Sequence, residues 1–244
     1  MALQDDTIVV FAPGAWNAGS AYDDFRELLK QKCIAAFAID HLSNGAEPPT
    51  KGLNDDVQNL RRVLIAHIDQ GKKIVLVGHS YGGMVITGAA QGLGLNEREA
   101  AGKRGGIKVL VFMTAFVSPK GKNLKDMVGG QLWPWMLVQG NYVRLGFAVD
   151  VVQDVSEELK ARHAKDIHSH ICLPAFLEPA TEEPWHTIPS AYIACDDDVA
   201  LPPAMQDSMI GLLPEPRVFR LPSGHNPFWS MPDETASILT ELCN

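Results

Sequence analysis

The pentapeptide Gly78-His79-Ser80-Tyr81-Gly82 lies where the sequence pattern changes from a strand to a helix. Residues 73–77 before it are β-branched and largely apolar, which is typical of a strand buried on both faces. Residues 84–90 after it are small and apolar, as in a closely packed helix. A serine at such a junction sits on a strained turn with its hydroxyl exposed above the sheet, and flanking glycines let the strand and helix approach. This setting predicts a strand–turn–helix unit with Ser80 available for chemistry.

Strand-like and helix-like runs alternate along the chain. The expected strands are residues 7–12, 34–39, 73–79, 108–114, 190–195 and 217–221, and the expected helices are residues 22–31, 53–70, 81–92, 203–213 and 232–242. In residues 53–70 the apolar positions Val57, Leu60 and Leu64 recur at helical spacing. The alternation predicts an α/β fold with a mostly parallel six-stranded sheet and helices on both faces. The length of 244 residues suits a single domain, residues 1–244.

Residues 120–187 interrupt the alternation. The segment is irregular and contains several aromatic residues, among them Trp133, Trp135 and Phe147, and a polar helix near residues 156–168. An insertion after the carboxyl end of a strand lies on the face where open α/β sheets bind ligands. We therefore expect a cap, or lid, over a site. The alternative is an ordinary covering layer at the edge of the sheet.

Charge and cysteine content narrow the classes of partner. The formal net charge is −8, the sequence pI is about 5.4, and no run rich in Lys or Arg occurs, which argues against nucleic acid or a membrane as a partner. The first six residues are acidic where a secretory signal would be basic, and the apolar run 7–12 is short, so we expect a cytoplasmic protein. Cysteines 33, 172, 195 and 243 show no metal-ligand spacing and are predicted to be buried free thiols.

A nucleophilic Ser80 needs a base and an acid that orients the base. His225 follows the last expected strand, from where it can reach a serine at the same edge of the sheet. Three other histidines, at 163, 168 and 170, are expected on a solvated face rather than at a metal. For the acid, Asp196, Asp197 and Asp198 all follow a buried strand, and spacing alone does not select one of them. The order serine, aspartate, histidine is that of a known hydrolase triad.

The tetrahedral intermediate of acyl transfer also needs backbone donors for its oxyanion. One donor is expected from the residue after the nucleophile, Tyr81. The other is expected from the loop after the first strand, where Gly14 gives the turn freedom and the amide of Ala15 is suitably placed. The alternative for Pro13-Gly14 is a plain surface turn.

With these motifs the chain resembles the small cap-bearing α/β hydrolases, in the branch near plant methylesterases and hydroxynitrile lyases and their fungal and bacterial relatives. The resemblance rests on segments 10–16, 77–83, 192–198, 201–202 and 224–228. It implies the α/β-hydrolase fold and selects Asp198, three residues after Cys195 and shortly before a Leu-Pro pair. The related lyases look as though they need a Thr in the oxyanion loop and a Lys directly after the catalytic His. This chain has Gly14 and Asn226 at those positions, so the resemblance implies an esterase rather than a lyase.

The resemblance and the motifs together predict a serine hydrolase without metal or organic cofactor. We expect it to cleave a small apolar or aromatic ester or lactone through an acyl-enzyme, with Trp16 beside the substrate. Further aromatic candidates for the pocket are Trp133, Trp135, Phe147, Phe228 and Trp229. The alternatives are lyase, C–C hydrolytic or ring-forming chemistry on the same fold, or a small-molecule receptor. The partner is a small molecule, and the protein is expected to be a monomer or homodimer.

Overall fold

The central sheet has six strands, all parallel. A computed structural model describes residues 6–146 and 150–244. The strands are β1 (Thr7–Ala12), β2 (Ala35–Ala38), β3 (Lys73–His79), β4 (Gly106–Met113), β8 (Ser190–Cys195) and β9 (Arg217–Leu221), in the spatial order β2-β1-β3-β4-β8-β9. This confirms the predicted sheet, with β2 shorter and β4 starting two residues earlier than expected.

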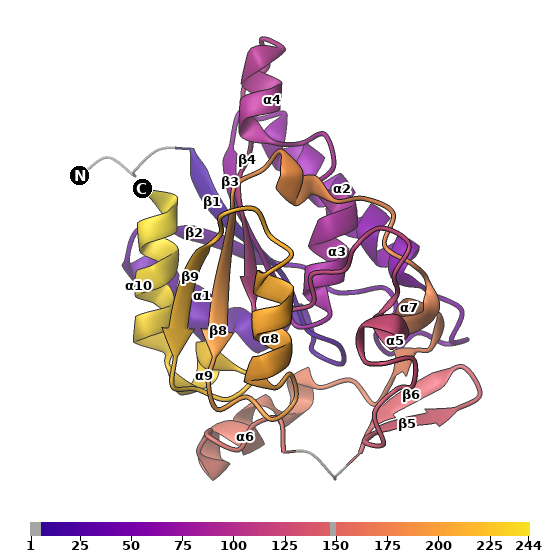
Figure 1. Ribbon diagram of the computed structural model, residues 1–244. Coiled ribbons are helices and arrows are strands. Elements are labelled where there is room, and N and C mark those ends of the chain that lie inside the picture. The colour runs from indigo at the N-terminus through magenta and orange to yellow at the C-terminus, as the bar shows by residue number, and fades with distance from the viewer. Residues whose placement is uncertain (1–5, 147–149) are drawn as a thin grey trace.

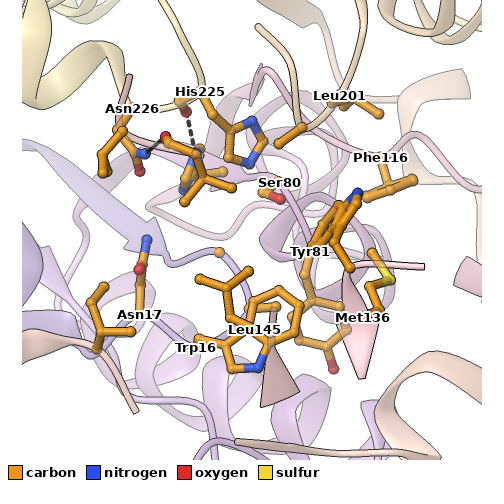
Figure 2. A pocket seen from close by; sticks show the side chains of 18 of the residues that line it. Trp16, Asn17, Ser80, Tyr81, Phe116, Met136, Leu145, Leu201, His225 and Asn226 are labelled. Carbon is orange, nitrogen blue, oxygen red and sulfur yellow. Dashed lines mark hydrogen bonds between the residues drawn. The ribbon is translucent and has the colours of Figure 1, made fainter. Parts of the chain in front are cut away.

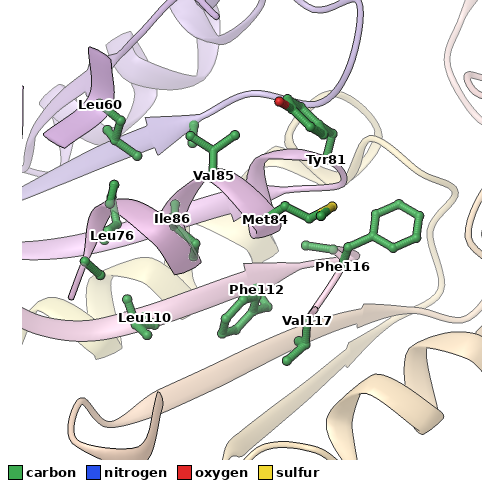
Figure 3. Close-up of a cluster of buried hydrophobic side chains, with 14 of the residues drawn as sticks. Leu60, Leu76, Tyr81, Met84, Val85, Ile86, Leu110, Phe112, Phe116 and Val117 are labelled. Atoms are coloured by element: carbon green, nitrogen blue, oxygen red, sulfur yellow. The ribbon is translucent and has the colours of Figure 1, made fainter. Parts of the chain in front are cut away.

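Helices cover both faces of this sheet (Figure 1). One face carries α1 (Asp23–Gln31) and α10 (Pro232–Cys243), and the other carries α2 (Leu53–Ile68), α3 (Gly82–Ala89) and α8 (Pro203–Ile210). Successive residues of a strand point to opposite faces, so Val9 and Phe11 join one core cluster and Val10 joins the other. Figure 3 shows part of the cluster to which Val10 belongs, between α3 and the sheet. The sequence analysis missed α4 (Leu95–Ala100), a short helix without a buried residue.

The chain direction across the sheet reverses between β1 and β3. From β1 the chain moves outward to β2, then returns to β3 on the other side of β1 and continues to β4, β8 and β9. In open α/β sheets the crevice at the carboxyl ends of two such strands is the preferred place for ligands. Here the loop after β1 begins at Pro13 and the turn after β3 contains Ser80, so the fold brings these two segments to the same crevice.

The insertion lies between β4 and β8. It contains α5 (Leu124–Met127), α6 (Glu157–His163), α7 (Pro174–Leu177), and an antiparallel sheet of β5 (Met136–Gln139), β6 (Tyr142–Leu145) and β7 (Ile171–Cys172), with short 3-10 turns at Ala164–Asp166 and Pro184–His186. The small sheet is additional to the prediction, whereas the polar helix is present as α6. Figure 1 places β5, β6 and α6 beyond the carboxyl ends of the central strands. That this segment works as a lid remains a prediction.

Two short elements complete the fold, a 3-10 turn at Gly19–Tyr22 and the helix α9 (Pro227–Ser230). No helix in the described ranges is long and apolar enough to cross a bilayer. All four cysteines are free, but only Cys172 and Cys195 are buried. Cys33 is exposed because it lies in the turn between α1 and β2, with φ of 62°, so its predicted burial is wrong.

Candidate active site

Ser80 occupies a tight turn between β3 and α3, with φ of 53°. A Cβ on Gly82 would lie 2.1 Å from the carbonyl oxygen of Ala12, and one on Gly78 would lie 2.6 Å from that of Gly82. Glycine is therefore required at both positions for the strand, the turn and the helix to pack this closely. The turn is also held by the Ser80 carbonyl, which accepts bonds from the amides of Gly83 at 3.0 Å and Phe116 at 3.1 Å. The serine side chain stays partly exposed, as the sequence motif predicted.

Asp198 and His225, 27 residues apart in sequence, meet at this edge of the sheet. The His225 Nδ1 atom lies 2.7 Å from Asp198 Oδ2, which also accepts a bond from the Thr114 hydroxyl. The second carboxylate oxygen, Oδ1, accepts bonds from the amides of Ala200 and Leu201, each at 2.8 Å. Because a carboxylate only accepts, the imidazole carries its proton on Nδ1 and leaves Nε2 free to take one. Figure 2 shows the His225 ring next to Ser80 in the same pocket.

Hydrogen bonding keeps the Asp198 carboxyl ionised in spite of its burial. Burial raises its pKa, but His225, the Thr114 hydroxyl and the Leu201 amide together lower the pKa below the usual value. Neither neighbouring aspartate shares this environment. Asp196 is exposed and pairs with Arg220, and Asp197 is exposed on the loop.

His79, next to the serine, supports the His225 loop. Its Nε2 lies 2.8 Å from the backbone oxygen of His225, and its ring is 99% buried. Burial and the neighbouring His225 lower the pKa of His79 to about 3, so the ring is neutral and donates from Nε2. The side chain thus points to the backbone of the loop, away from a role as base for Ser80.

The loop after β1 lies directly against the serine turn. A Cβ on Gly14 would lie 3.2 Å from the Ser80 Cβ, so Gly14 allows this approach. The backbone of Trp16 has φ of 67°, and its amide donates to Asn44 Oδ1 at 3.0 Å. Within the described ranges the amides of Ala15 and Tyr81 donate to no protein group, and both residues line the pocket beside Ser80. That these amides hold an oxyanion stays a prediction.

A buried carboxylate holds the side chain of Tyr81, one of these two residues. Asp56 on α2 is fully buried and accepts bonds from the Tyr81 hydroxyl at 2.8 Å and from the Ser43 amide and hydroxyl at 3.0 and 2.5 Å. Burial raises the pKa of the Tyr81 hydroxyl, which therefore stays protonated and donates. Asn44, next to Ser43, holds the Trp16 amide. Asp56 thus fixes Tyr81 on one side of the site, and Asn44 fixes Trp16, the residue after Ala15, on the other.

The pocket over Ser80 is apolar and largely aromatic. The space between its atoms is about 640 Å³, which includes a part open to solvent. The predicted Trp16, Trp133, Trp135 and Trp229 line it, together with Phe116, Phe176, Met136, Leu145 and Leu201, which the sequence analysis missed. Phe228 instead stacks on Tyr22 with ring centroids 4.2 Å apart, so its expected place in the pocket is wrong, and Phe147 lies outside the described residues. The lining residues of the described ranges include no Asp, Glu, Lys or Arg.

A comparison with protein-family models matches residues 9–238 to the alpha/beta hydrolase family. The chain belongs to the α/β hydrolase family. The match extends over both the central sheet and the insertion, and it confirms the predicted fold and enzyme class.

Named relatives of this hydrolase are themselves hydrolases. It is 29% identical over 204 residues to probable hydrolase R7 of a Phoma species, with 80% of each chain covered. It is 28% identical over 243 residues to alpha/beta hydrolase nvfD of Aspergillus novofumigatus, with 92% of each covered. A carbendazim hydrolyzing esterase of a Nocardioides species is 30% identical over 132 residues, 53% of this chain and 50% of the relative.

The same fold occurs in a solved methylesterase structure from Arabidopsis. The TM-score is 0.73 at 18% identity, with 96% of this chain and 98% of the other covered. This likeness shows the shared fold.

Two histidines of the hydrolase that were expected on a solvated face are buried instead. The His163 ring stacks on Trp229 with ring centroids 4.7 Å apart, and its Nδ1 lies 3.0 Å from Asp166 Oδ2. The His170 Nε2 lies 3.1 Å from the Ala46 carbonyl oxygen. Local patterns did not reveal this burial, because Trp229 and Ala46 lie far from these histidines in the sequence.

Proposed function

We propose that this α/β hydrolase is a serine esterase that cleaves small, neutral, apolar or aromatic esters or lactones. The observation that carries the proposal is the Asp198–His225 hydrogen bond at the edge of a pocket that also contains Ser80 and two free backbone amides. These are the parts that acyl transfer through a covalent intermediate requires.

In the proposed reaction the His225 Nε2 removes the Ser80 hydroxyl proton as Oγ bonds to the substrate carbonyl carbon. The carbonyl oxygen becomes an oxyanion held by the amides of Ala15 and Tyr81, each donor contributing about 3 kcal/mol in the transition state. The intermediate then collapses, the ester C–O bond breaks, and the imidazolium returns the proton to the departing alcohol oxygen. Water attacks the acyl-enzyme with His225 again as base, which releases the carboxylic acid and restores the serine.

The pocket supports a neutral substrate. An ionised group on the substrate would lose its hydration among Trp16, Phe116 and Trp135 without finding an opposite charge, which is unfavourable in an apolar environment. Aromatic side chains also provide stacking surfaces for rings. Hydrolysis of an ester is further supported by the esterase name of the Nocardioides relative.

The test is covalent labelling combined with hydrolysis. We expect a fluorophosphonate to add once to the wild type at Ser80, detected by intact-mass and peptide mass spectrometry, and the protein to hydrolyse short p-nitrophenyl esters. Ser80→Ala should abolish the label and lower kcat by about 10⁴- to 10⁶-fold while remaining folded. A folded wild type without an adduct would refute the nucleophile. Turnover of a genuine substrate retained by Ser80→Ala would instead indicate non-covalent lyase or cyclase chemistry.

A further inference from the structure

The backbone of Asn17 is fixed on both sides, next to the proposed oxyanion donor. Its amide donates to the Gly14 carbonyl at 3.2 Å, and its carbonyl accepts a bond from the Asn44 side chain at 3.0 Å. It also forms a β-bridge with Ile167 of the insertion. Asn17 therefore has a defined position two residues beyond Ala15.

The side chain of Asn17, in contrast, bonds to no group in the part of the chain that the structure describes. The residue is 7% exposed and lines the pocket, but among the described residues no group bonds to its carboxamide. Its polar atoms are not among the fully buried, unpaired side-chain atoms of the described residues, and the residue lines the pocket. Figure 2 shows the carboxamide on the side of the pocket opposite Phe116 and Met136.

An unpaired carboxamide at an apolar wall weakens the folded state, because a largely desolvated polar group gains no compensating hydrogen bond from the protein. The neighbouring Asn226 differs, since its Nδ2 donates to the Val151 carbonyl at 2.7 Å. The position of Asn17 is therefore hard to explain by folding and simple to explain by a ligand.

We propose that Asn17 is a specificity-determining residue that binds a neutral oxygen of the substrate close to its ester group. This rests on the proposed esterase function and narrows its substrate class to oxygen-bearing esters: those with a hydroxyl, ether or second carbonyl near the scissile bond. A carboxamide both donates and accepts, so it pairs with each of these groups. A carboxylate is excluded, because the described lining residues offer no cation.

Two pairs of esters test the inference, each differing by one oxygen function. Methyl mandelate and methyl phenylacetate differ in a hydroxyl on the acyl half, and 2-methoxyphenyl acetate and phenyl acetate differ in an ether on the alcohol half. We expect the wild type to prefer the oxygenated member of one pair by about tenfold in kcat/KM, the effect of one neutral hydrogen bond. The pair that responds shows which half of the ester lies against Asn17.

Asn17→Leu, similar in size but apolar, should abolish that preference by lowering kcat/KM on the oxygenated ester about tenfold relative to the unsubstituted one, and its Tm should equal or exceed that of the wild type. The matched control Leu145→Val alters the shape of the same pocket without a polar change and should keep the preference. An unchanged ratio in Asn17→Leu, or no preference in the wild type, overturns the inference.

A binding measurement separates this inference from the proposed function. The amides mandelamide and phenylacetamide can occupy the pocket without ester cleavage, and calorimetry measures their affinities directly. If Asn17 recognises an acyl-side hydroxyl, the wild type binds mandelamide more tightly and Asn17→Leu does not. If the wild type is not labelled at Ser80 but still binds mandelamide more tightly than phenylacetamide, the esterase proposal is refuted and the Asn17 inference stands. If the wild type is labelled but distinguishes neither the esters of a pair nor the two amides, the Asn17 inference is refuted and the esterase proposal stands.

Discussion

Replacement of Asp198 by asparagine keeps the shape of the side chain and tests how it orients His225. In the protein Oδ1 accepts two backbone amides, and Oδ2 faces the His225 ring and the Thr114 hydroxyl. If the new NH₂ group faced the two amides, two buried donors would lose their acceptor, at about 1–3 kcal/mol each. The oxygen of the asparagine therefore stays on the amides, and its NH₂ group faces His225.

This orientation places the imidazole proton on the wrong nitrogen. An NH₂ group can only donate, so Nδ1 of His225 becomes the acceptor and the proton moves to Nε2, toward Ser80. The ring then cannot take the serine proton, and the imidazolium loses its carboxylate partner. We expect kcat/KM of Asp198→Asn to fall by about 10⁴-fold, equivalent to about 5 kcal/mol of transition-state stabilisation.

The assay is steady-state hydrolysis of a p-nitrophenyl ester, with the rate of fluorophosphonate labelling as a second readout. A decrease of less than about tenfold would refute the orienting role, because a tautomer shift leaves little base catalysis.

The free energy of unfolding of wild type and variant, measured as a function of pH, supplies a control. Ionised Asp198, with its pKa lowered in the folded state, stabilises the fold above the unfolded value of 3.8, and this contribution disappears as the pH falls through the folded pKa. The stability difference between wild type and variant should therefore narrow below about pH 4.

Three other perturbations have defined outcomes. Gly82→Ala should lower the free energy of unfolding by about 3 kcal/mol in urea titrations, because its Cβ meets the Ala12 carbonyl oxygen at 2.1 Å; an unchanged midpoint would contradict the close packing. Asp56→Asn replaces the acceptor of the Ser43 and Tyr81 hydroxyls by an NH₂ group, so both hydroxyls must turn to accept, and two bonds to a carboxylate become neutral ones. The change should cost about 2 kcal/mol and lower kcat more than it changes KM in full kinetics; a KM effect alone would refute the role of Asp56 in holding Tyr81. His79 has its pKa lowered from 6.5 to about 3, so the unfolded state binds more protons and the fold weakens by up to about 1.4 kcal/mol per unit as pH falls from 6.5. In His79→Gln the free energy of unfolding should fall less steeply with decreasing pH than in the wild type. The same slope in both proteins would exclude His79 as the cause.

The central sheet and the catalytic candidates were predictable because their signals are local. Four of the six strands have the predicted bounds, since continuous apolar runs between turns are typical of buried parallel strands. Ser80 is identified by glycines that the packing requires on either side. Selection of Asp198 needed the family resemblance, because Asp196 and Asp197 are as close to the strand in sequence, and their exposure and different partners are visible only in the folded chain.

The insertion and the pocket wall were less predictable, for a physical reason. The small antiparallel sheet has strands of two to four residues, too short for a periodic pattern. Asp56 lies in the first turn of α2, where acidic residues are common, and its partners Ser43 and Tyr81 are 13 and 25 positions away in the sequence. Asn17 has no motif at all. Such residues are defined by contacts that only the folded chain brings together.

The insertion also contributes to the geometry of the loop after β1. The Trp16 indole donates to the Val143 carbonyl at 2.9 Å, its backbone oxygen accepts from the His168 amide at 2.7 Å, and the Ala18 amide donates to Asp166 at 2.8 Å. Grafting a foreign cap from a relative onto this sheet would therefore replace more than the substrate walls. Unless the graft reproduces these three hydrogen bonds, the loop after β1 would shift in the chimera and move the proposed oxyanion donor Ala15 relative to Ser80. Exchange of specificity by cap swapping would then fail because the reaction slows, and not because the substrate binds less tightly.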